Sequence, residues 1–164
     1  MRRNGFTLVE LIVVMAILAI LGTFVGLSVS NVFSAEARKA ASVIDAEITQ
    51  CKIDSMSREG TSVVRLSLDG DGRAMCELLR NGTAAESETF SSRVTVQYYT
   101  DAGGDTAYSL TSPLYLSFDR DTGAFVRQTE NAAGGNCVRI VALGGSSSGT
   151  IALVPSTGSH SVGG

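Results

Sequence analysis

Glu10 is the first side chain whose chemistry needs an explanation, because it places a carboxylate at the start of a long apolar run. No charged residue follows it between positions 11 and 35. An acidic side chain at the centre of a membrane helix costs roughly 2.5–3.5 kcal/mol, and less near the interface. A carboxylate at this position is therefore unfavourable unless a cation pairs with it, and the sequence predicts such a partner.

The apolar run at residues 11–35 is predicted to span a membrane. At about 1.5 Å per residue, a helix of this length exceeds the roughly 30 Å hydrocarbon thickness of a bilayer. Arg2 and Arg3 precede the run, and the positive-inside bias then places the N-terminus in the cytoplasm. Small residues recur every four positions within the run, which favours close helix packing over a merely loosened anchor. They are Gly22, Gly26, Ser30 and Ser34.

A secretory signal peptide is one alternative for this segment. Its apolar region normally spans about 7–15 residues, which is shorter than this run, and it ends at a small-residue cleavage site. The triplet Ala35-Glu36-Ala37 would fit such a site, but it lies beyond the run and precedes Arg38 and Lys39. An ordinary single-pass anchor is a second alternative, and it leaves the charge of Glu10 without a purpose.

The segment Gly5-Phe6-Thr7-Leu8-Val9-Glu10-Leu11, with the basic leader before it and the apolar run after it, resembles the class III signal peptide of type IV pilins and pseudopilins. The resemblance implies that prepilin peptidase, a membrane-embedded aspartyl enzyme, cleaves after Gly5 and methylates the new amine of Phe6. Glycine suits the position before the cut because it has no side chain to hinder the approach of a catalytic pair.

The resemblance also implies a partner for Glu10, which is the N-terminal ammonium of Phe6 in a neighbouring subunit. Removing one partner of a buried ion pair is strongly destabilising, so this pair would fix the position at which each subunit adds. The chain is then expected to be a structural subunit of a type IV pilus or pseudopilus. It would reside in the cell membrane first and in an extracytoplasmic or surface filament after assembly.

The same resemblance names the expected partners and leaves the subtype open. The partners are other pilin subunits, prepilin peptidase, and an inner-membrane assembly platform with its ATPase. A major pilin, a minor pilin and a pseudopilin of type II secretion or DNA uptake all share this N-terminal chemistry. The presence of Glu10 argues only against the tip-most pseudopilins that lack it.

Beyond the membrane segment, an amphipathic half of the same helix is predicted over residues 36–59. Apolar residues recur there at steps of three and four, which is the spacing of one buried helix face. They are Ala37, Ala40, Ala41, Ile44, Ile48 and Cys51. No proline interrupts the chain from Phe6 to Arg58, and Gly60 is the expected end. The chain thus divides into a leader at 1–5, a membrane and filament-core helix at 6–35, and this outer half.

Residues 60–155 are predicted to form an antiparallel β domain, because apolar residues alternate with period two between Gly- and Asp-rich turns. The expected strands and hairpins are 64–68 with 74–79, a strand at 94–98, 114–118 with a return from 125, and 137–143 with 150–154. Residues 84–92 and 102–106 are expected to be loops, and 156–164 a flexible tail that contains His160. The fold class is therefore α+β, with the helix packed on one antiparallel sheet or two small ones, and the strand number resembles that of minor pseudopilins.

The cysteines and acidic turns indicate no metal or cofactor. Three cysteines allow at most one internal disulfide, and we expect Cys76 to pair with Cys137 while Cys51 packs on the helix. No CxxC spacing or histidine partner indicates zinc. The turn at 69–72 lacks the Glu that a calcium loop carries at its twelfth position, where this chain has Arg80.

Composition argues against nucleic-acid binding and catalysis. The net charge is −3 and the bases are scattered, so the sequence presents no basic face for phosphates. It also lacks a nucleophile motif, a phosphate loop and a histidine within an expected element. We therefore expect no enzymatic activity. The alternative function is a membrane-anchored extracytoplasmic binding domain that does not polymerise, which would use its loops and leave Glu10 unexplained.

Overall fold

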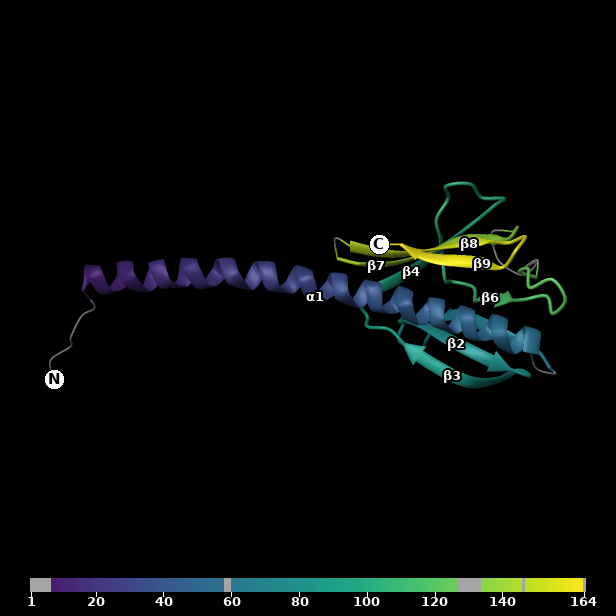
Figure 1. Cartoon of the computed structure of the whole chain (residues 1–164). Coiled ribbons are helices and arrows are strands. Elements are labelled where there is room, and N and C mark those ends of the chain that lie inside the picture. The colour runs from purple at the N-terminus through teal and green to yellow at the C-terminus, as the bar shows by residue number, and fades with distance from the viewer. Residues whose placement is uncertain (1–6, 58–59, 127–133, 146, 164) are drawn as a thin grey trace. The chain divides into compact units, whose positions relative to one another are not determined.

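A computed structural model describes residues 7–57, 60–126, 134–145 and 147–163, without the side chains of residues 21–34 (Figure 1). The chain divides into two compact units, and the boundary lies between Val32 and Phe33. The first unit contains the start of helix α1, which runs over Leu8–Ser57. The second contains the rest of α1 and all the described strands.

Helix α1 begins where Thr7 caps its first turn. The Thr7 hydroxyl accepts a hydrogen bond from the Glu10 backbone N–H at 3.3 Å, and the Thr7 carbonyl accepts one from the Leu11 N–H at 3.2 Å. A threonine at this position satisfies a backbone donor that the helix itself leaves unpaired. The helix then continues to Ser57 without interruption, as the absence of proline predicted.

Two antiparallel sheets follow the helix. The four-stranded sheet has the order β3-β2-β1-β6, and the five-stranded sheet has the order β5-β4-β7-β8-β9. The strands of the first are β1 Ser62–Leu68, β2 Ala74–Arg80, β3 Thr83–Thr89 and β6 Leu114–Ser117. Those of the second are β4 Val94–Thr100, β5 Tyr108–Ser109, β7 Cys137–Gly144, β8 Ser147–Val154 and β9 Ser159–Gly163. The α+β fold class is confirmed, and the arrangement has two sheets.

The predicted hairpins that carry a clear alternating pattern agree with the structure. β1 pairs with β2 from Ser62↔Arg80 to Leu68↔Ala74, and β7 pairs with β8 down to Gly144↔Ser147. The return from Phe125 is shorter than expected, because Phe125 forms a single bridge with Phe118 and residues 127–133 lie outside the described chain. β6 instead pairs with β1, a partner distant in sequence.

Two predictions about irregular segments are wrong. The expected loop at 84–92 largely forms β3, an edge strand whose side chains are almost all exposed. Within the expected flexible tail at 156–164, residues 159–163 form β9, which pairs with β8 from Val154↔Ser159 to Thr150↔Gly163. Both segments form strands through hydrogen bonds to a neighbouring strand. Neither has the alternating apolar pattern of a half-buried strand, so the sequence pattern did not predict them.

One face of α1 supplies the centre of the core. The six apolar residues that the helical spacing selected, from Ala37 to Cys51, are each at most 1% exposed. All of them except Ala37 join side chains of both sheets in one hydrophobic cluster. Within the second unit, the helix lies between β2 and β3 on one side and β7, β8 and β9 on the other (Figure 1).

The helix and β8 are in close contact at Gly149. A Cβ atom added to Gly149 would lie 2.6 Å from the Cβ of Ala41 and 3.1 Å from the carbonyl oxygen of Ala37. Real Cβ atoms do not come this close, so small residues on both elements are what allow the sheet to approach the helix.

We expect Gly149→Ala to lower the free energy of unfolding by about 1–3 kcal/mol, because the added methyl group must displace the helix backbone. Thermal unfolding of the purified chain in detergent measures this. Gly163→Ala is the matched control, since a Cβ there meets nothing within 4 Å. Equal melting temperatures for the two variants would contradict the close approach.

Candidate functional site

Of the predicted processing and assembly residues, the structure describes Glu10. Glu10 occupies the first turn of the helix, and its side chain is exposed. Gly5 and Phe6 lie outside the described residues. The backbone is helical at Gly22, Gly26, Ser30 and Ser34, but the side chains of this stretch are outside the description as well. The structure therefore leaves cleavage, methylation and helix packing as predictions.

Thr7 is a residue of this site that our sequence analysis did not single out. Thr7 and Glu10 have the Ser/Thr-x-x-Glu spacing of a capping box, which could have identified the helix start. The cap at Thr7 means that helical structure begins two residues after the expected cut. The Glu10 carboxylate is also favourably placed near the positive end of the helix dipole.

The first turns of α1 expose apolar side chains on all sides. The large apolar residues from Leu8 to Ile20 are between 47% and 74% exposed in the isolated chain. Such an exposed apolar surface indicates contact with lipid or with other protein chains. No helix in the described part of the chain is both long and apolar enough to cross a membrane. The predicted membrane segment at 11–35 includes the stretch 21–34, whose side chains are not described.

A family comparison identifies this N-terminal segment. Residues 1–26 match the family model described as the prokaryotic N-terminal methylation motif. The chain has the N-terminus of a type IV pilin-like precursor. This confirms the resemblance to type IV pilins and pseudopilins, and the motif implies a membrane-anchored precursor, pilin subunits as partners and processing by prepilin peptidase. No curated protein and no solved structure matches the chain.

His160 lies in an ordered cluster between β9 and α1, contrary to our expectation of a solvated tail residue. Its Nε2 is 2.9 Å from the Thr49 hydroxyl and 3.6 Å from Asp45 Oδ1, and its side chain is 12% exposed. The Thr49 hydroxyl donates to the Asp45 backbone carbonyl at 2.9 Å. Because the Thr49 hydroxyl already donates to Asp45, it can accept a hydrogen bond from Nε2 of His160.

This cluster lacks the geometry of a catalytic triad. In a triad, the carboxylate orients the imidazole through the ring nitrogen that does not face the nucleophile. Here Asp45 and Thr49 both approach Nε2 of His160, and Nδ1 is buried without a hydrogen-bond partner in the described structure. The cluster thus connects the last strand to the helix and does not activate the Thr49 hydroxyl.

The predicted disulfide between Cys76 and Cys137 is absent. Cys76 lies on β2 of the four-stranded sheet, and Cys137 lies on β7 of the five-stranded sheet. The predicted disulfide would therefore connect strands of different sheets. Both are free and buried, as is Cys51 on the helix. Burial raises the pKa of the Cys51 thiol to about 11 and that of Cys137 to about 12, and it raises the pKa of Cys76 as well.

We expect the three thiols to resist alkylation in the folded protein. At pH 8, a thiol with a pKa of about 11 is ionised to about one part in a thousand, and only the thiolate is nucleophilic. Intact mass after iodoacetamide treatment should show no added groups in the native chain and an addition at every cysteine after denaturation. A mass lower by two hydrogens under non-reducing conditions would instead show that a disulfide forms.

A network of charges connects the helix to the four-stranded sheet. Asp54, which is 3% exposed, accepts hydrogen bonds from Arg80 Nε at 2.6 Å and from Gln50 at 3.0 Å. Arg80 also lies 3.6 Å from Glu86 on β3. Burial and the charge of Glu86 raise the pKa of Glu47, whereas Arg80 lowers it. Glu47 is therefore the least favourable charge in this network.

The Glu47→Gln variant tests that conclusion through pH. A carboxyl group with a raised folded-state pKa stabilises the fold when protonated, and this contribution is lost as the pH rises through the folded value. We expect Glu47→Gln to stabilise the fold at pH 7 by at most about 1 kcal/mol, because solvent screens this partly exposed group. The difference from wild type should disappear near pH 3. A variant less stable than wild type at pH 7 would contradict the assignment.

The carboxylates of the acidic turn at residues 69–73 accept hydrogen bonds from groups of the same turn. Arg73 donates to Asp69 at 2.8 Å and to Asp71 at 3.2 Å, and backbone N–H groups of the turn also bind Asp69. These bonds lower the pKa of Asp69, with the Arg73 backbone N–H as the main cause. Across the described residues, no cluster of three or more acidic, histidine or cysteine side chains could hold a metal ion.

Proposed function

We propose that this chain is a structural subunit of a type IV pilus or pseudopilus. Prepilin peptidase cleaves it after Gly5 and methylates Phe6, and the mature subunit enters a filament through its N-terminal helix. The observation that carries the proposal is the methylation motif at residues 1–26, which extends directly into a helix with exposed apolar side chains and Glu10 in its first turn.

Glu10 pairs in this proposal with the N-terminal ammonium of Phe6 in a neighbouring subunit. Two features support the pairing. The Glu10 carboxylate is exposed on α1, and in the described structure no ion pair occupies it. Apolar side chains surround it on the same helix, so assembly would desolvate the charge and make an opposite charge necessary. The pair would then set the axial position of each new subunit.

The fold suits a structural subunit whose polar clusters hold the fold together and whose surface makes contacts with other subunits. The polar clusters of the second unit bind α1 to the sheets, as Asp54 does with Arg80 and His160 with Thr49. The chain then works without a cofactor, with other pilin subunits, the peptidase and an inner-membrane platform with its ATPase as partners. A membrane-anchored binding domain that does not polymerise is the competing function.

Processing by the peptidase tests the proposal. The full chain is expressed with and without a prepilin peptidase, and mass spectrometry determines the N-terminus and mass of the product. We expect an N-methylated Phe6 only with the peptidase, and its loss in Gly5→Leu, whose side chain obstructs the peptidase. A product that begins at Met1 regardless of the peptidase, or near Ala37, would overturn the proposal.

Variants of the first helical turn separate the charge of Glu10 from the helix cap. Glu10→Ala and Glu10→Gln remove the charge, and we expect cleavage with poor methylation or with loss of filament incorporation. Thr7→Ala is the matched control, because it removes the cap and typically weakens a helix end by about 1 kcal/mol without changing charge. Normal filament incorporation of Glu10→Gln would show that the ion pair is dispensable.

A further inference from the structure

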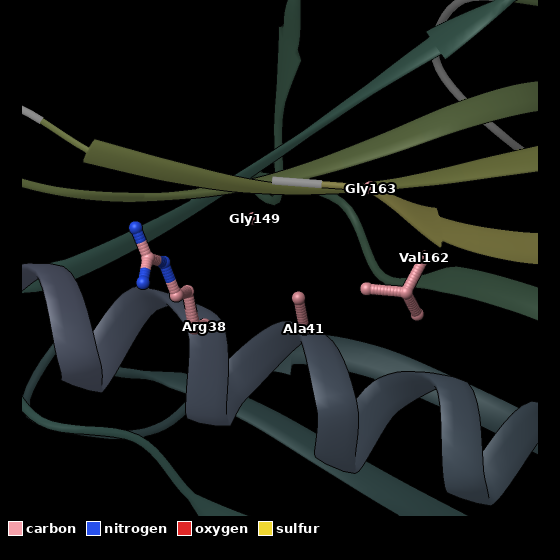
Figure 2. Close-up of a pocket in the computed structure, with 5 residues that line it drawn as sticks. All are labelled: Arg38, Ala41, Gly149, Val162 and Gly163. Atoms are coloured by element: carbon pink, nitrogen blue, oxygen red, sulfur yellow. The ribbon is translucent and has the colours of Figure 1, made fainter.

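An open pocket lies between the helix and the last two strands of the second unit. Arg38, Ala41, Gly149, Val162 and Gly163 line it, and its volume is about 370 Å³. Figure 2 shows Arg38 and Ala41 extending from the helix toward the strands, with Val162 directed into the space between them. A Cβ added at Gly163 would meet nothing within 4 Å, so the pocket is open on the side of Gly163.

Arg38 gives this pocket an uncompensated positive charge. Its side chain is exposed, and no ion pair or side-chain hydrogen bond engages it in the part of the chain that the structure describes. The adjacent Lys39 differs, because it pairs with Glu88 at 3.4 Å and lines a separate hollow. The remaining walls of the Arg38 pocket are small or apolar. The pocket therefore suits a carboxylate at the tip of a narrow loop.

A candidate for that loop is the turn at residues 119–123, at the other end of the same helix face. Residues at steps of three and four lie on one face of a helix, and Ala41, Asp45, Thr49, Lys52 and Met56 follow this spacing. Ala41 borders the pocket, and Gly123 packs against Lys52 and Met56. About 22 Å of helix separates Ala41 from Met56 at roughly 1.5 Å per residue.

Strand β9 fills the flank between the pocket and the turn. His160 of β9 contacts Thr49 in the middle of this flank. In the turn just before β9, the carbonyl oxygens of Thr157 and Gly158 accept hydrogen bonds from Lys52 at 3.3 and 2.9 Å. Gly158 in turn lies against Gly123. The pocket and the turn are thus opposite ends of a single surface formed by α1 and β9.

Asp121 is the carboxylate that the turn presents to solvent. Asp119 is used internally, because its Oδ1 accepts hydrogen bonds from the Thr122 N–H at 2.8 Å and the Thr122 hydroxyl at 2.7 Å. Arg120 lines a different hollow, next to Ser62 and Val63. Asp121 is exposed, and its carboxylate has no partner within the described chain.

We propose that Asp121 of one copy enters the Arg38 pocket of a second copy further along the filament, beyond the neighbour that pairs with Glu10, so that subunits join head to tail along the α1–β9 flank. The two surfaces lie at opposite ends and differ from each other, so each copy keeps one free pocket and one free turn. A heterologous contact of this kind produces an open filament unless its rotation closes a ring. This inference rests on the proposed filament function and adds the contact that aligns the globular units.

Charge reversal in the full chain tests the pairing. Arg38→Glu, Asp121→Arg and the double variant are co-expressed with prepilin peptidase and the assembly platform, and filament yield is compared with the mass of the processed subunit. Like charges across an interface oppose association, so we expect each single variant to reduce filament yield about tenfold or more. The double variant should restore the yield, because it recreates the opposite charges.

Three further variants separate docking from folding. Gly163→Val adds to the pocket a side chain whose Cβ meets nothing within 4 Å in the single chain, so it should reduce filament yield and leave the melting temperature unchanged. Lys39→Glu and Asp105→Arg are matched reversals outside the two surfaces, and both should assemble normally. All variants should carry methylated Phe6.

The outcomes distinguish this inference from the proposed function. Single reversals that assemble like wild type, or a double variant that does not recover, would overturn the Arg38–Asp121 contact while leaving the filament function in place. A wild-type chain that is processed but never enters filaments would overturn both.

Discussion

The burial of one face of α1 between two sheets is the constraint on which the second unit depends. Ile44, Ile48 and Cys51 are 0% exposed, and each sheet on its own would expose the apolar face that it turns toward them. Two small antiparallel sheets cannot cover both of their faces without such an element. The helix is therefore the structural centre of this unit and also the element that carries Glu10, the predicted assembly residue.

This arrangement accounts for where small and polar residues occur. Gly149 is required where β8 meets Ala41, because there is no space for another methyl group. The polar residues border the apolar face and bind the helix to one sheet through Asp54 and Arg80, and to the other through Thr49 and His160. The buried carboxylate of Asp54 thus has a specific partner in Arg80, which offsets its loss of hydration.

The same arrangement separates the two kinds of contact that a filament subunit needs. Exposed apolar side chains at the start of α1 offer a surface that is strong but poorly specific. Charged groups contribute little affinity when exposed, but they select orientation and register. In our proposals, Glu10 provides that selectivity in the helical part, and Arg38 with Asp121 provides it in the globular part.

The sequence by itself determined the pilin-like N-terminus, the extent of α1, its buried face and the β1–β2 and β7–β8 hairpins. These features follow from local chemistry: a cleavage motif, helical and alternating periodicity, and turn residues between adjacent strands. Only the tertiary structure decided that β6 pairs with β1, that residues 159–163 form a strand holding His160 against Thr49, and that Cys76 and Cys137 lie in different sheets. Those outcomes depend on partners distant in sequence, which no local pattern specifies.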